Sequence, residues 1–247
     1  MKGYTVALSV LLLFALVSYS MKPYFKSLNT DTVLYYWSMF TVLTGIWEFF
    51  YVTMYSSILK YAVRLKETGA HVWTLDYSVL AVFPQKTAML FYAEYGAHAD
   101  REYMSGARGD FWSRLIESSH ALCCGLFCLG FLINTYNGNV TAATWLIGAG
   151  MGAQFMNSLL YMGQYFLECR DKHSPNYNSP KFPLGPLMLK RWFMWVNLAW
   201  LVFPAYILYT HVGSAMLLTP LALARYAHRR TPNTYMPAIS VEAPKIE

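Results

Sequence analysis

Charged residues are scarce in this sequence. Asp, Glu, Lys and Arg together make up 13% of the 247 residues, whereas about 25% is usual in a soluble domain. Hydrophobic residues make up 56% of the chain. This balance excludes an ordinary water-soluble domain and indicates a protein that is embedded in a membrane.

Cysteine is also rare. The four cysteines include no Cys-x-x-Cys pair, and the histidines form no zinc-binding pattern along the sequence. Three of them, Cys123, Cys124 and Cys128, fall within one apolar run, where we expect small buried hydrophobic residues. The cysteine and histidine pattern therefore predicts no zinc site.

The distribution of basic residues does not indicate a nucleic-acid-binding surface. Lys and Arg outnumber Asp and Glu by 19 to 13. The excess is spread over the segments between the apolar runs, and no basic face is interleaved with exposed aromatic residues. The loops of a membrane protein account for this charge, so nucleic acid is excluded as an expected partner.

What the sequence has instead is a series of long apolar runs. A membrane-spanning helix needs about 20 predominantly apolar residues. Five runs approach or exceed that length: 4–20, 32–59, 111–133, 142–167 and 192–209. The predicted fold is therefore all-α, a polytopic membrane bundle of about five transmembrane helices. A shorter apolar piece at 212–224 would extend the last helix past a kink or lie at the interface.

The first run has two interpretations. It has a Lys near its start and an apolar centre, which a cleaved signal peptide would share. No clear small-x-small cleavage site precedes Met21, so we expect an uncleaved first helix.

The orientation in the membrane stays open. The segment 135–141 has no basic residue and holds the sequon Asn139-Val140-Thr141, which favours the lumenal side for it. With five crossings, the basic tail would then be lumenal too, against the usual charge rule.

The polar stretch 61–108 is the longest between two apolar runs. A loop of that length is usually functional or partly structured. Its aromatic residues suit the headgroup level of a membrane, where we expect short interfacial segments carrying Trp73, Tyr77, Phe91, Tyr92 and Tyr95.

Ionisable side chains interrupt the second and third apolar runs. Glu48 lies near the middle of 32–59, and Glu117 and His120 stand three apart near the start of 111–133. Such a group costs about 2.5 to 3.5 kcal/mol in a membrane helix and normally faces the bundle interior or a cavity. The alternatives are that Glu48 is a protonated carboxyl bonded to another helix, and that the Glu117–His120 pair is solvated at the interface.

Asn197 and Trp200 are three apart in the fifth run and share one helix face. They could simply join and pack helices. Together with the ionisable groups, however, they suit acid–base chemistry. A carboxyl in an apolar cavity keeps its proton to higher pH, an imidazole can take a proton back, and a tryptophan face stabilises a cation. The residues alone predict acid–base chemistry on a lipophilic olefin.

Over about residues 37–212 the chain resembles the emopamil-binding protein family, the sterol Δ8–Δ7 isomerases, and the wider EXPERA group. An ordered set of motifs carries the resemblance: Glu48 in an aromatic-rich helix, "EYGAHADREY" with Glu94, Asp100 and Tyr103, Gly109-Asp110 seven residues before Glu117, "YFLECRD", and "NLAWLVFP" with Asn197, Trp200 and Pro204.

The resemblance implies a bundle of five helices around a sterol pocket, with no cofactor and no metal. Glu48 and Glu117 would handle protons, and Trp200 would steady a carbocation. Asn197 would orient the substrate or an acid. Further substrate-binding candidates on this interpretation are Thr44, Trp47, Asp100, Tyr103 and Tyr161.

The same resemblance predicts the organisation of the chain. Residues 1–30 would form the first transmembrane helix and a short loop, 31–212 the EXPERA-like membrane domain, and 213–247 an apolar extension with a disordered basic and polar tail. We expect an integral protein of the endoplasmic reticulum membrane. Its partners would be membrane lipids and a lipophilic small molecule, a sterol or terpenoid, and a homodimer is compatible with such a bundle.

One position departs from the family pattern. The isomerases carry a histidine four residues before the glutamate of the second helix, where this chain has Thr44. We hypothesise that His120 supplies the missing imidazole from another helix. Three functions remain open: a sterol or terpenoid isomerase, a terpene (meroterpenoid) cyclase acting on a prenyl chain or epoxide, and a non-catalytic sterol- or lipid-binding protein.

Overall fold

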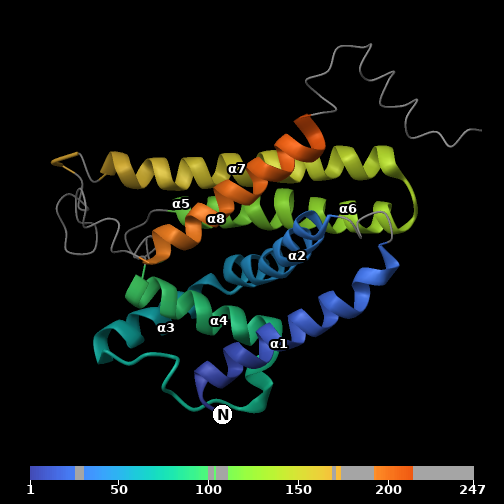
Figure 1. Cartoon of the computed structure of the whole chain (residues 1–247). Coiled ribbons are helices and arrows are strands. Elements are labelled where there is room, and N and C mark those ends of the chain that lie inside the picture. Colours follow the sequence, from blue (N-terminus) through green and yellow to red (C-terminus); the bar gives the residue numbers. More distant parts are fainter. Residues whose placement is uncertain (26–30, 100–102, 104–110, 169–170, 174–191, 214–247) are drawn as a thin grey trace, which may run out of the picture.

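The computed structural model describes residues 1–25, 31–99, 103, 111–168, 171–173 and 192–213. Within these ranges every regular element is helical, which confirms the predicted all-α fold (Figure 1). The α-helices are α1 (Gly3–Met21), α2 (Thr32–Thr53), α3 (Tyr55–Thr68), α4 (Pro84–Glu94), α5 (Trp112–Ser119), α6 (Leu126–Tyr136), α7 (Val140–Glu168) and α8 (Trp192–Ile207). Short π-helical turns are η4 (Tyr95–Ala99), η6 (His120–Gly125) and η8 (Leu208–Gly213).

Two helical stretches of the described residues are long and apolar enough to cross a membrane. They are Gly3–Tyr24 and Trp112–Tyr136, the second of which runs through α5, η6 and α6. The bent pair α2 and α3 makes a third if it counts as one span. These lengths are compatible with a membrane protein, as the apolar runs predict.

The apolar run 32–59 does not form one continuous helix. The side chain of Asp31 caps α2 by accepting the Leu34 N–H at 2.8 Å, and α2 ends at Thr53. There α3 departs at 88°. The hydrophobic pattern changes at this point from an apolar helix to an amphipathic one. α3 buries only one face, formed by Tyr55, Ile58, Ala62 and Leu65.

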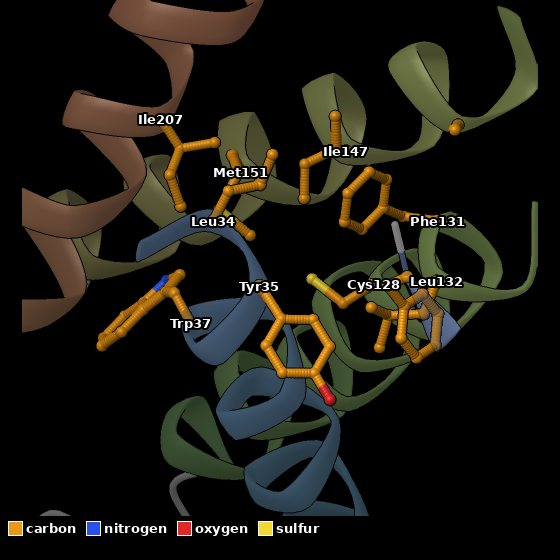
Figure 2. Close-up of a cluster of buried hydrophobic side chains, with 11 residues drawn as sticks. Leu34, Tyr35, Trp37, Cys128, Phe131, Leu132, Ile147, Met151 and Ile207 are labelled. Carbon is orange, nitrogen blue, oxygen red and sulfur yellow. The ribbon is translucent and has the colours of Figure 1, made fainter. Parts of the chain in front are cut away.

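One hydrophobic core lies where α2, α6, α7 and α8 meet (Figure 2). Each of these helices contributes buried side chains: Leu34, Tyr35 and Trp37 from α2, Cys128, Phe131 and Leu132 from α6, Ile147 and Met151 from α7, and Ile207 from α8. The Tyr35 hydroxyl also donates to the Ser18 carbonyl at 2.7 Å and so joins α1 to α2. This packing holds the walls of the site described next.

A second core joins α1, α3 and α4. The chain start is fastened to the segment after α3, because the Met1 ammonium donates to the Tyr77 carbonyl and Lys2 pairs with Asp76 at 2.7 Å. Most of the predicted extension over 212–224, and all of the tail, lie outside the described residues.

Candidate functional site

A cavity of about 240 Å³ lies among α2, α4, α5, η6, α7 and α8. Its wall contains nine of the residues that the sequence nominates: Thr44, Trp47, Glu48, Tyr103, Glu117, His120, Tyr161, Asn197 and Trp200. The tenth, Asp100, lies outside the described residues. Glu48, Glu117 and His120 are all buried, so the alternative of a Glu117–His120 pair exposed at the surface does not describe this structure.

Two glycines let the helices that carry these groups approach closely. A Cβ added at Gly45 of α2 would stand 2.8 Å from the Cα of Gly125 in η6, and one added at Gly125 would stand 3.0 Å from the Cα of Gly45. Only a residue without a side chain fits at either position. This backbone contact lies about one turn from Glu48 and from His120, and it brings their two helices within side-chain reach.

Glu48 and His120 form the central contact of the site. Nδ1 of His120 lies 2.5 Å from Oε2 of Glu48, and the two side chains are 9% and 7% exposed. The residues are far apart in the sequence and come from different helices. The imidazole therefore lies beside the α2 glutamate from another helix, where the hypothesis about His120 requires it; its role stays a prediction.

Gln154, which the sequence analysis did not nominate, determines which nitrogen of His120 carries the proton. The indole N–H of Trp37 lies 2.7 Å from Oε1 of Gln154 and can only donate. The amide nitrogen of Gln154 is thus a donor, and it lies 3.0 Å from Nε2 of His120. Nε2 must accept, so the imidazole proton is on Nδ1 and points at the Glu48 carboxylate.

Glu117 has a different partner. The Tyr103 hydroxyl donates to Oε1 of Glu117. Burial raises the pKa of Tyr103 well above its ordinary value. The phenol therefore keeps its proton at neutral pH and stays a hydrogen-bond donor to this carboxyl.

Aromatic side chains form much of the remaining wall. The Trp200 ring lies 5.5 Å from the Phe40 ring in a stacked arrangement and 5.2 Å from the His120 ring, edge to face. Phe91, Tyr92 and Tyr95, for which the sequence predicts the headgroup level, line this cavity. Such π-faces offer negative potential to a cation inside the cavity.

The local backbone at His120 is unusual. Glu117 is in the last turn of α5, and His120 opens the π-helical turn η6. Single π-turns inside a helix are rare and often occur at functional sites. Both side chains face the cavity, as their spacing of three predicts.

No family model, no curated protein and no solved structure matches this chain. Fold and site alone define its class: a helical protein with spans suited to a membrane and a buried cavity that combines two carboxyls, an imidazole and an aromatic wall.

Proposed function

We propose that this protein is an integral membrane enzyme that isomerises a sterol or terpenoid by moving a C=C bond. The observation that carries the proposal is the convergence of Glu48, Glu117, His120 and Trp200 on one buried cavity. An acid, a base and an aromatic wall in a mostly apolar cavity suit a reaction that passes through a carbocation.

The hydrogen bonds support different steps for the two carboxyls. Glu48 already accepts a hydrogen bond from the Nδ1–H of His120, and we assign it the role of base. Glu117 accepts a hydrogen bond from the Tyr103 hydroxyl, and we assign the acid proton to this carboxyl.

In the proposed reaction Glu117 adds its proton to one alkene carbon and becomes a carboxylate. The positive charge forms on the other alkene carbon, beside the Trp200 face. Glu48 then removes a proton from a carbon next to the cation, and those C–H electrons form the shifted double bond. One proton enters and one leaves, and proton exchange with water restores both carboxyls.

A neighbouring cavity offers room for an elongated substrate. It has a volume of about 600 Å³ and shares Phe91, Tyr95 and Val196 with the first. Binding sites for small molecules are usually clefts of about 300–1,000 Å³ with mostly apolar walls. A lipophilic substrate that enters from the membrane would place its olefin beside Glu48 and Glu117 and the rest of its skeleton in the second cavity.

The proposal includes the resemblance to the emopamil-binding protein and EXPERA group, on the ordered motifs given above. It also includes about five crossings, in which α7 and α8 join α1, the α2–α3 pair and α5–α6. The endoplasmic reticulum, membrane lipids and a sterol or terpenoid ligand belong to the same proposal.

A second candidate function is cyclisation of a prenyl chain or epoxide. Thr44, in the place of the isomerases' histidine, lines the cavity, and its hydroxyl donates to the Thr41 carbonyl at 3.1 Å. It therefore adds no base to the site. Cyclisation needs one acid to start and only a final proton loss, which Glu117 and Glu48 would supply.

Expression in a yeast that lacks its own sterol Δ8–Δ7 isomerase tests the proposal. We expect Δ7 sterols to reappear with the wild-type chain and to stay absent with Glu117→Gln, because an amide cannot donate the proton. Both chains are quantified in the membrane fraction. Continued accumulation of Δ8 sterols with normal expression would exclude sterol isomerisation, and prenylated substrates and sterol binding would then be assayed for the cyclase and binding alternatives.

His120→Ala is expected to lower turnover in microsomes by about 100-fold or more, the usual contribution of a group that assists proton transfer. The loss of the Nδ1–H bond leaves the Glu48 carboxylate without its partner. His120→Asn keeps a side-chain N–H donor and should recover part of the activity. Full turnover in His120→Ala would remove His120 from the mechanism.

A further inference from the structure

Three side chains of metal-ligating type meet outside the reaction cavity. His71 follows α3, Glu94 is the last residue of α4, and His98 lies in η4. One ligand atom from each of the three lies within 4.8 Å of the others. Only Glu94 and His98 are close in the sequence, four residues apart, a spacing that places two side chains on one helix face.

Hydrogen bonds prepare these groups to bind a cation. Nε2 of His98 lies 2.9 Å from the Ala70 carbonyl, which can only accept, so Nε2 carries the hydrogen and Nδ1 keeps a lone pair. A backbone carbonyl that holds one ring nitrogen in this way is typical of metal-binding histidines. Oε2 of Glu94 accepts the Val72 N–H at 2.9 Å, which orients the carboxylate.

Oε1 of Glu94 and Nδ1 of His71 lie 2.6 Å apart. The two imidazole rings lie 4.0 Å apart between centroids. Bonds to zinc are about 2.0 to 2.2 Å long for these ligand types. Small side-chain shifts would therefore place one ion among the three groups. The ion would replace the hydrogen of the bond between His71 and Glu94.

We propose that His71, Glu94 and His98 form a binding site for a divalent transition-metal ion of the zinc class. Two histidines and one carboxylate are a known zinc ligand set that leaves a fourth position open. All three residues line the second cavity of about 600 Å³. Water, or an oxygen atom of a molecule in that cavity, takes the fourth position.

The ion would tie the segment after α3 to the end of α4. Glu94 and the Val72 N–H already make part of this connection, so the metal adds to an existing anchor. The inference does not depend on the proposed isomerisation, because its residues lie outside the first cavity and its test measures binding.

The test uses the full chain purified in detergent with an affinity tag that contains no histidine, after treatment with a chelator. Co²⁺ is titrated and followed by its visible absorption, and Zn²⁺ is measured by competition. We expect about one ion per chain. His71→Gln and His98→Gln should each weaken binding at least about tenfold.

Glutamine at position 98 keeps an N–H for the Ala70 carbonyl, so a folding defect is not expected from this variant. His173→Gln is the matched control, because His173 is exposed and lies in a different segment. Wild-type protein that binds no stoichiometric ion, or His98→Gln that binds as tightly as the wild type, would overturn the proposal.

Discussion

Glu48→Gln is expected to reduce isomerisation about 1,000-fold or more, within the range that a lost acid–base group costs. The amide has nearly the same shape, and its oxygen can still accept the Nδ1–H of His120. It cannot take a proton from carbon, however. The cavity and the Gly45–Gly125 contact should therefore survive while the deprotonation step is lost. Turnover is measured in microsomes against the amount of protein in the same membranes.

Glu67→Gln is the matched control for this change. Glu67 is exposed on α3 and lies outside the cavity wall. The same substitution there should leave turnover unchanged and unfolding unaltered. Near-normal turnover in Glu48→Gln would assign the base to another residue, and an unfolded Glu48→Gln would mean that this carboxyl is structural.

Much of the fold follows from the scarcity of charge. Apolar runs of sufficient length predict helices, and the structure has helices in all five places. The bend between α2 and α3 could not be predicted in this way, because the apolar run continues past the bend to Ile58 and Leu59 of α3. Its amphipathic pattern becomes visible only further along, where Lys60, Arg64 and Lys66 are exposed.

The candidate site was partly predictable for the same reason. A carboxyl inside an apolar run is conspicuous, and Glu48, Glu117 and His120 could be selected on that basis. Gln154 and Trp37 were not selected, because their importance lies in contacts between helices that are far apart in the sequence. One signal was available for Gln154, namely a strongly polar side chain within the apolar run 142–167.

Which groups meet depends on packing between distant segments. Only the family resemblance suggested pairing Glu48 with His120; the spacing of residues does not, because their contact depends on how closely α2 and η6 approach. The same holds for His71, which comes to Glu94 only when the segment after α3 folds back on α4. A pattern of spacing along one helix cannot report such contacts.

Gly45→Ala is expected to cost about 1–3 kcal/mol of stability and to lower turnover at least tenfold. The added Cβ would lie 2.8 Å from the Gly125 Cα, so backbone rather than a flexible side chain must move. Overpacking of this kind usually costs that much. Separation of α2 and η6 would also lengthen the Glu48–His120 contact of 2.5 Å. Thermal unfolding in detergent and microsomal turnover measure the two effects.

Gly152→Ala provides the comparison, since a Cβ at Gly152 of α7 meets no atom within 4 Å. Alanine favours a helix over glycine by up to about 1 kcal/mol, so this variant should unfold at the same or a higher temperature. A double variant, Gly45→Ala with Gly125→Ala, should lose more stability than Gly45→Ala alone, because both new side chains need the same space. If Gly45→Ala behaved like Gly152→Ala, the close approach of α2 and η6 would not be what holds the acid–imidazole pair together.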